Sequence, residues 1–185
     1  GTAAVAGQSL AEFLGALLVD TEVRVKALPA TELSGFSMRP DMGDTLVVAI
    51  SQSGTTTDTN RTVDLVRSRG AKVVAIVNRR GSDLTDKADG VLYTADGRDV
   101  EMSVASTKAF YSQVAAGMLL AYGIAGAVPG AHNATESAEQ EVLRAITELP
   151  VLMEEVLATR PAIAAAAAAH APSRRYWALV GNGVN

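Results

Sequence analysis

Cysteine is absent from the 185-residue sequence, and histidine occurs only at His132 and His170. Without cysteine the chain can form no disulfide scaffold, thiolate nucleophile, cysteine-ligated zinc site or iron–sulfur cluster. Two histidines so far apart in the sequence do not indicate a metal site. We therefore expect no metal and no cofactor, and nothing in the composition indicates an oxidising compartment.

Aromatic residues, positive charge and long apolar runs are also scarce. Aromatic residues make up 4% of the chain and hydrophobic residues 48%, which predicts a core of alanine, valine and leucine. The formal net charge of −4 argues against a nucleic-acid surface, because binding there depends on neutralising phosphates. The longest apolar stretch, 114–128, is shorter than the roughly 18 residues of a membrane span. We expect a cytoplasmic protein with no nucleic-acid or membrane partner.

The middle of the chain alternates strand-like and helix-like segments. Residues 45–50 and 72–77 are continuous apolar runs rich in valine, typical of parallel strands covered on both faces. Between them, 56–69 has helical spacing and is followed by Gly70, a favourable helix end. The pattern predicts a parallel sheet between layers of helices. The other predicted elements are strands at 22–27 and 90–94 and helices at 3–19 and 107–122.

After residue 130 the composition changes to helix formers. We predict two helices between 135 and 171, with breaks at Pro150 and Pro161, and a last strand at 176–180. The chain begins in what resembles a strand-to-helix loop and ends where a second α/β unit would open. We therefore expect it to be part of a larger protein.

The most informative motif is the segment S-Q-S-G-T-T-T at 51–57, directly after a predicted strand and at the start of a helix. The carboxyl ends of parallel strands form the ligand crevice in such sheets, and a helix N-terminus favours an anion. Ser51, Ser53 and Thr56 would add hydroxyl donors, and Gly54 would let the backbone approach the ligand. Alternatively these residues only cap the helix. Six hydroxyl or amide side chains in seven positions favour a phosphate site.

A second polar cluster, S-V-A-S-T-K at 103–108, precedes another long apolar helix. Ser106 would either cap that helix or reach a ligand held at the first loop. Lys108 lies in the first turn, where a cation opposes the helix dipole unless it has an acidic or ligand partner. Gly1-Thr2 would form a third loop at the same edge. Neither a Walker loop nor a dinucleotide motif follows a predicted strand, which disfavours nucleotides.

Four ordered motifs resemble the sugar isomerase (SIS) domain family. They are S-Q-S-G at 51–54, V-N and G-S within 77–82, V-L-Y-T at 91–94, and V-A-S-T-K-A-F at 104–110. They are similar in particular to the isomerase part of the glucosamine-6-phosphate synthases, which are glutamine:fructose-6-phosphate aminotransferases. The resemblance implies a flavodoxin-like three-layer α/β sandwich with a five-stranded parallel sheet. The domains that it implies are a first SIS domain with a truncated start (1–128), linking helices (129–172) and the truncated first strand of a second SIS domain (173–185).

The resemblance also implies the ligand and its contacts. The ligand would be a sugar phosphate such as fructose 6-phosphate or glucose 6-phosphate, and the protein would be a homodimer. This segment would be catalytically incomplete, because in the family the general base and the ammonia-receiving chemistry depend on the second domain and the C-terminal tail. By motif match, the phosphate would be held by Ser51, Gln52, Ser53 and Thr56, the sugar would face Thr2, Val104 and Ser106, and Lys108 would have a supporting role.

Two departures from the family pattern keep other functions open. Ala3 stands where the family usually has serine, and Thr55 replaces a usual glutamate. These changes weaken the inference of substrate identity more than that of phosphate binding. The alternatives are a tandem-SIS deglycase or deaminase of amino-sugar phosphates, a non-catalytic sugar-phosphate sensor, and a scaffold whose serines only cap helices.

Overall fold

The computed structural model of this protein describes residues 1–95, 108–131 and 136–178. Contacts divide the chain into two units, Gly1–Asn133 and Ala134–Asn185, and each is described by itself. The first unit contains α1 (Thr2–Leu17), α2 (Ala30–Glu32), the π-helical turn η1 (Leu33–Ser37), β1 (Leu46–Ser51), α3 (Thr57–Ser68), β2 (Lys72–Val77), α4 (Asp83–Lys87), β3 (Gly90–Tyr93) and α5 (Lys108–Ala127).

The sheet of the first unit has three described strands in the order β1-β2-β3, and both pairs are parallel. β2 lies between the other two, so its run of valine, alanine and isoleucine is the most buried of the three. This confirms the strands that were predicted at 45–50, 72–77 and 90–94. The described residues do not confirm the predicted five-stranded sheet.

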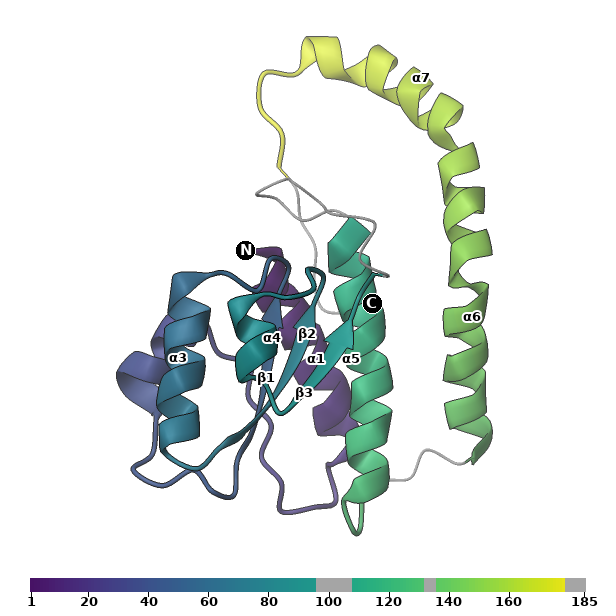
Figure 1. Ribbon diagram of the computed structural model, residues 1–185. Helices are drawn as coiled ribbons and strands as arrows, with labels where there is room; N and C mark the ends of the chain where they lie inside the picture. The colour runs from purple at the N-terminus through teal and green to yellow at the C-terminus, as the bar shows by residue number, and fades with distance from the viewer. Residues whose placement is uncertain (96–107, 132–135, 179–185) are drawn as a thin grey trace. The chain divides into compact units, whose positions relative to one another are not determined.

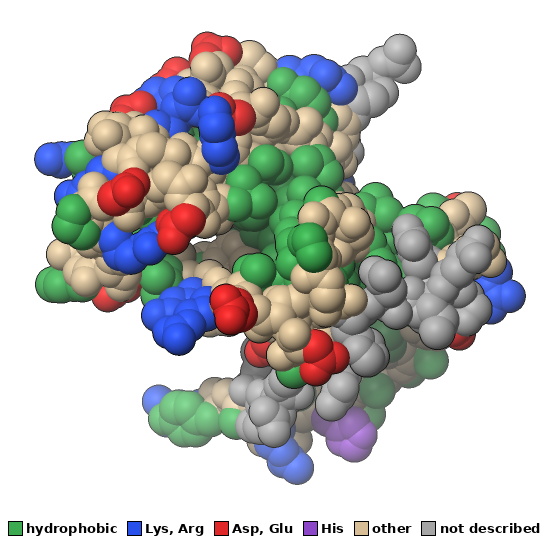
Figure 2. Space-filling model, turned by 90° about the horizontal axis from the view of Figure 1, so that it is seen from below, with side chains coloured by type: hydrophobic (Ala, Val, Ile, Leu, Met, Phe, Trp, Pro, Cys, Tyr) green, Lys and Arg blue, Asp and Glu red, His purple; other side chains and the backbone are tan. Residues whose placement is uncertain are grey.

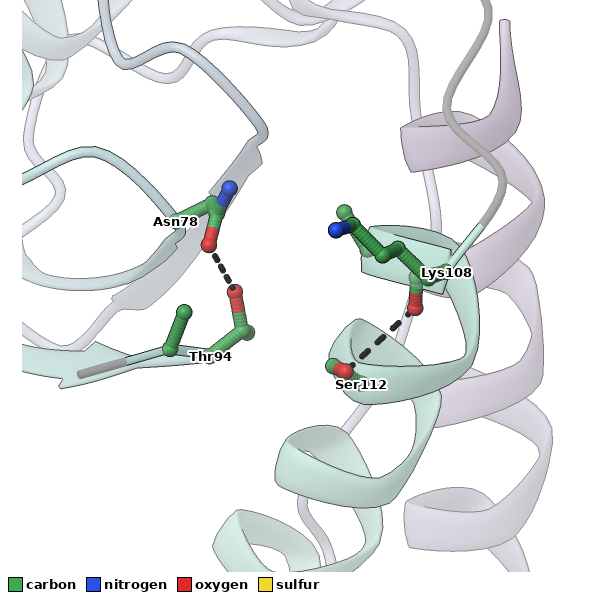
Figure 3. A pocket seen from close by; sticks show the side chains of 6 residues that line it. Asn78, Thr94, Lys108 and Ser112 are labelled. Atoms are coloured by element: carbon green, nitrogen blue, oxygen red, sulfur yellow. Dashed lines mark hydrogen bonds between the residues drawn. The ribbon is translucent and has the colours of Figure 1, made fainter. Parts of the chain in front are cut away.

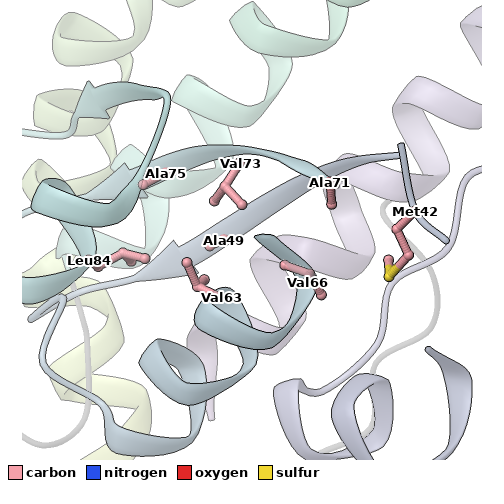
Figure 4. Close-up of a cluster of buried hydrophobic side chains, with 8 residues drawn as sticks. All are labelled: Met42, Ala49, Val63, Val66, Ala71, Val73, Ala75 and Leu84. Atoms are coloured by element: carbon pink, nitrogen blue, oxygen red, sulfur yellow. The ribbon is translucent and has the colours of Figure 1, made fainter. Parts of the chain in front are cut away.

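Helices cover both faces of the sheet (Figure 1). α3 and α4 pack on one face over a cluster of small and branched apolar side chains (Figure 4). Alanine and valine from the strands allow α3 to approach the sheet closely. This packing accounts for a core that needs almost no aromatic residues. The cluster consists of Met42, Ala49, Val63, Val66, Ala71, Val73, Ala75 and Leu84.

The opposite face is covered by α1 and α5, which pack on each other along most of their length. Gly117 of α5 approaches Leu10 of α1 so closely that a Cβ there would lie 3.4 Å from the leucine Cβ. The rings of Phe13 and Tyr122 meet edge to face with centroids 5.4 Å apart. By length and composition alone α5 could cross a membrane, and it is the only such helix among the described residues. In this structure the apolar residues of α5 pack against α1 inside the domain.

The prediction of a strand at 22–27 is wrong, because residues 23–29 have no regular secondary structure. The alternation that suggested it is present, since Val25 and Ala27 are half-buried whereas Arg24 and Lys26 are exposed. A period of two predicts which side chains turn inward, but a strand also needs a partner for its backbone hydrogen bonds. The described residues offer this segment no such partner.

The second unit contains α6 (Glu136–Ala158), α7 (Arg160–His170) and the short 3-10 helix η2 (Ala171–Ser173). Pro161 lies in the first turn of α7, which confirms the break predicted there. The break predicted at Pro150 is wrong, because α6 continues through it. Pro150 is exposed, so water can satisfy the carbonyl that loses its helical partner. Residues 174–178 have no regular secondary structure, and the rest of the predicted strand at 176–180 lies outside the described residues.

Hydrogen bonds and ion pairs of charged side chains connect neighbouring segments at the end of the sheet where β2 begins. Asp89 accepts hydrogen bonds from the Val73 backbone N–H at 2.8 Å, from Arg67 at 2.7 Å and from Lys72 at 3.3 Å. These contacts join the end of α3 to the start of two strands. A view from this end shows Lys and Arg side chains interspersed with Asp and Glu (Figure 2).

The Asp89 contacts predict a specific pH dependence of stability. The backbone hydrogen bond from Val73 is the main cause that lowers the pKa of Asp89, with Lys72 and Arg67 acting in the same direction. A lowered folded-state pKa stabilises the fold above the unfolded value of about 3.9, and the effect is lost as pH falls through the folded-state pKa. Asp89→Asn keeps an acceptor for Val73 but removes the charge. Thermal unfolding followed by circular dichroism should show the largest difference from wild type at neutral pH and none at the acid end; a constant difference would contradict this account.

Candidate functional site

The polar segments singled out in the sequence gather at one end of the sheet. The serine loop, residues 51–57, connects β1 to α3, and the loop 78–82 connects β2 to α4. The first turns of α1 and α5 lie at this same end, where the strands have their carboxyl termini (Figure 1). This is the edge at which open α/β sheets bind ligands.

Two serines shape the serine loop from within. The Ser51 side chain is buried, and its Oγ accepts a hydrogen bond from the Gly54 N–H at 3.0 Å. Ser53 is half-buried, and its Oγ accepts from the Thr55 N–H at 3.2 Å and from the Thr55 hydroxyl at 3.0 Å. Ser51 therefore holds the loop in its conformation, whereas Ser53 lies nearer to the surface.

Thr56 occupies the position before the first turn of α3, yet its side chain makes no capping hydrogen bond. It is exposed, and so are Thr57 and Asp58 behind it. The first N–H groups of an α-helix have no partner within the helix. The interpretation that these hydroxyls only cap the helix therefore fails at the residue best placed to do so. Thr56 presents a hydroxyl beside the positive end of a helix dipole.

Asn60, which the sequence reasoning missed, anchors the serine loop from the first turn of α3. Its side-chain amide donates to the Gly54 carbonyl at 2.9 Å and to the Thr56 carbonyl at 3.1 Å, and only 7% of the residue is exposed. The available signal was an asparagine three residues before Val63, on the face of the helix that turns toward the core. Polar residues on such a face need partners, and here the partners are the loop carbonyls.

The serine loop is also fastened to the loop after β2. The Gln52 carbonyl accepts from the backbone N–H groups of Asn78 at 3.2 Å and Arg79 at 3.3 Å, and the Gly54 carbonyl accepts from the Leu84 N–H at 3.1 Å. Gln52 thus contributes its backbone to the loop and keeps a half-buried side chain. The consequence is a pair of loops joined by backbone hydrogen bonds at the carboxyl ends of neighbouring strands.

A small pocket of about 60 Å³ lies beside these loops, between the end of β3 and the first turn of α5 (Figure 3). On one side, the Thr94 hydroxyl donates to Asn78 Oδ1 at 3.4 Å. On the other side lie Lys108 and Ser112, whose hydroxyl donates to the Lys108 carbonyl at 3.3 Å. Lys108 lies in the first turn of α5, as predicted, and it lines this pocket. The described lining residues are Asn78, Thr94, Ala95, Lys108, Ala109 and Ser112.

The three residues predicted to face a sugar are only partly placed. Thr2 is half-buried and begins α1. Val104 and Ser106 lie outside the described residues. Near the same edge the guanidinium of Arg80 stacks over the Tyr93 ring at 4.1 Å. Within residues 1–95, 108–131 and 136–178, no three His, Cys, Asp or Glu side chains are grouped to hold a metal ion.

Comparison with known protein families identifies the domain. The SIS domain family matches residues 21–122, more than half of the chain. The chain belongs to the SIS domain family. Its α/β architecture, with helices on both sides of a parallel sheet, agrees with this assignment.

Two relatives show which members of the SIS family this domain is similar to. The glutamine–fructose-6-phosphate aminotransferase [isomerizing] of Mycolicibacterium smegmatis is 43% identical over 129 residues, covering 70% of this chain and 20% of the relative. The enzyme of the same name from Halobacterium salinarum is 38% identical over 159 residues, covering 85% of this chain and 25% of the relative. The chain thus spans about a quarter or less of the length of these relatives.

A solved structure supports the same relationship. The C-terminal domain of glucosamine-fructose-6-phosphate aminotransferase from Francisella tularensis superposes with a TM-score of 0.64 at 27% identity, covering 81% of this chain and 39% of that chain. The resemblance inferred from the four motifs is therefore confirmed, as is the α/β SIS fold.

Proposed function

We propose that this SIS domain binds the phosphate of a hexose 6-phosphate at the serine loop. The observation that carries the proposal is the exposed Thr56 hydroxyl, which makes no cap bond although it stands at the start of α3. Ser53, Gln52 and the first N–H groups of α3 would complete the site, with the positive end of the helix dipole stabilising the anion. Ser51 would act by holding the loop.

The sugar would extend from the serine loop across the carboxyl edge of the sheet, toward Thr2, Val104 and Ser106. The relatives named above are aminotransferases of fructose 6-phosphate by name, which favours that substrate class over an amino-sugar deaminase, a sensor or a scaffold. The whole protein would carry tandem SIS domains, each with a five-stranded sheet. Residues 1–128 would belong to the first domain, 129–172 would link the two, and 173–185 would begin the second.

This segment would bind the substrate without completing the reaction. Isomerisation of a hexose phosphate needs a general base near C1 and C2, which the larger protein would supply. A homodimer remains a prediction.

Removal of single hydroxyls tests the phosphate site. We expect Thr56→Ala and Ser53→Ala each to weaken binding of fructose 6-phosphate about 10- to 150-fold, because a hydrogen bond to a charged group contributes about 1.5–3 kcal/mol. Isothermal titration calorimetry on the chain measures the affinity.

A matched control for these variants is Ser68→Ala, which removes an exposed hydroxyl at the far end of α3 that donates to the Leu65 carbonyl at 2.7 Å. It should leave the affinity unchanged. Equal affinities for wild type, Thr56→Ala and Ser53→Ala, or no binding by wild type, would refute the proposed phosphate site.

A further inference from the structure

The pocket between β3 and α5 is joined directly to the serine loop. The backbone N–H of Asn78 donates to the Gln52 carbonyl of that loop, while the Asn78 side chain lines the pocket. One residue therefore belongs to both features. A ligand whose phosphate sits at the serine loop would meet this pocket along the carboxyl edge of the sheet.

The size of the pocket limits what it can hold. A water molecule needs about 10–15 Å³ of such volume, and the pocket provides about 60 Å³. It has room for a few waters or for the hydroxylated end of a small ligand, but not for a nucleotide base or a dinucleotide. Its described lining offers an amide, two hydroxyls and an ammonium group, which suit hydroxyl groups.

Gln113, one helical turn after Ala109 of the pocket lining, supplies an independent observation. It is the most buried polar side chain among the described residues, with 1% exposed, and neither its Nε2 nor its Oε1 has a hydrogen-bond partner. It stands in the stripe of α5 formed by Ala109, Gly117, Ala121 and Ala125, where every other member is alanine or glycine. An unpaired buried amide is costly, so an apolar residue would suit the free protein better.

The geometry of the helix directs Gln113 toward the pocket. Residues four apart lie on the same face of an α-helix, and long side chains lean toward the helix N-terminus. The Gln113 side chain therefore lies over the turn that contains Ala109, and Ala109 lines the pocket. Ser112, its neighbour in sequence, lines the pocket as well. Gln113 is not itself part of the described lining, so its amide would lie one layer behind Ala109.

We propose that the pocket lined by Asn78, Thr94 and Ser112 is a subsite for the sugar hydroxyls of the phosphosugar, and that Gln113 is its specificity-determining floor residue. Its amide would pair with a ligand hydroxyl, directly or through one ordered water. The inference rests on the proposed phosphosugar function and deepens it. It explains why an unpaired amide persists in a helix face that is otherwise alanine and glycine.

The test compares two ligands on one variant. Gln113→Met keeps the length of the side chain and removes both polar atoms. For the chain we expect its affinity for fructose 6-phosphate to fall about 5- to 10-fold, the effect of one lost hydrogen bond. Its affinity for inorganic phosphate, which does not reach the subsite, should stay within twofold.

Without ligand, the Tm of Gln113→Met should stay the same as that of wild type or rise by about 2–4 °C, because an unsatisfied buried group is removed. Gln8→Met, on the exposed face of α1, is the control and should change nothing.

Each alternative outcome is decisive. Unchanged fructose 6-phosphate affinity in Gln113→Met, or a parallel loss of phosphate affinity, would overturn the subsite while leaving the phosphate site standing. A wild-type chain that binds neither ligand would overturn the proposed function itself. If Gln113→Met does not fold, Thr94→Val provides the same comparison from the opposite wall. It removes the hydroxyl that faces Asn78 and should selectively weaken fructose 6-phosphate binding, whereas equal affinities would reject the subsite.

Discussion

Gly54→Ala is expected to abolish most phosphosugar binding and to lower the Tm substantially. Gly54 has φ +66°, and an added Cβ would lie 2.7 Å from Ser82 Cβ, 3.1 Å from Val77 Cγ2 and closer still to Ser82 Oγ. The left-handed conformation costs a non-glycine residue about 1–2 kcal/mol, and overpacking a close contact costs about 1–3 kcal/mol more. The two costs add up to a loss of roughly 2–5 kcal/mol in the free energy of unfolding. In a chain of this size, that loss corresponds to a fall in Tm of at least about 4 °C and up to about 20 °C.

The loop would have to move to relieve this clash. Gly54 N–H donates to Ser51 Oγ, and the Gly54 carbonyl accepts from both Asn60 and Leu84. A displacement at Gly54 therefore breaks the contacts that fix the serine loop to α3 and α4. Calorimetric titration with fructose 6-phosphate and thermal unfolding measure the two effects.

Gly81→Ala is the control that distinguishes the cost of the left-handed backbone from the cost of the steric clash with Ser82. Gly81 has φ +60°, almost the same conformation, but nothing lies within 4 Å of its added Cβ. This variant should lose only the conformational part, about 1–2 kcal/mol, and retain most of its affinity. If Gly81→Ala proves as damaging as Gly54→Ala, close packing at Ser82 is not what makes glycine necessary in the serine loop.

The role of Gly54 shows how far the sequence could predict the site. The motif around it correctly indicated a loop after a strand and before a helix, because chain order and apolar periodicity determine that placement. We predicted glycine there so that the backbone could approach a ligand. The structure gives another reason, the contact with Ser82, which lies 28 residues further along the chain. Contacts between distant segments leave no local pattern.

The same limit explains the other differences from the sequence predictions. The strands from 45 to 94 were predictable because their burial on both faces makes them continuous apolar runs. The segment 22–27 carries a strand pattern but has no described pairing partner, and Pro150 lies in a helix whose exposed face tolerates it. Asn60 and Gln113 escaped notice because each is a single polar residue in a helix. Their importance follows from burial, which only the fold reveals.

Asn60→Asp replaces only the side-chain NH2 group by an oxygen, yet we expect it to strongly weaken the binding of fructose 6-phosphate at the serine loop. The Asn60 amide nitrogen donates to the carbonyls of Gly54 and Thr56 at 2.9 and 3.1 Å. A carboxylate in its place would put negative charge against both oxygens inside the fold and next to the proposed phosphate site. Burial and the facing carbonyls would raise the pKa of the new carboxyl, and binding of fructose 6-phosphate at neutral pH should fall more than about 100-fold, equivalent to about 2.7 kcal/mol.

The pH dependence of Asn60→Asp identifies the cause of its loss. With a folded-state pKa above the unfolded value of about 3.9, the penalty is complete above the folded-state pKa and vanishes below the unfolded value. The Tm difference from wild type, measured at each pH by circular dichroism, should therefore shrink as pH falls, because the protonated acid can again donate to a carbonyl. Gln8→Glu, which adds the same charge to an exposed position of α1, should show neither the affinity loss nor this recovery. Asn60→Leu, which removes the side-chain donor without adding charge, should be destabilised by about 1–3 kcal/mol at neutral pH because the carbonyls of Gly54 and Thr56 each lose one of their two donors. If it binds fructose 6-phosphate as tightly as wild type, Asn60 does not hold the serine loop in its binding conformation.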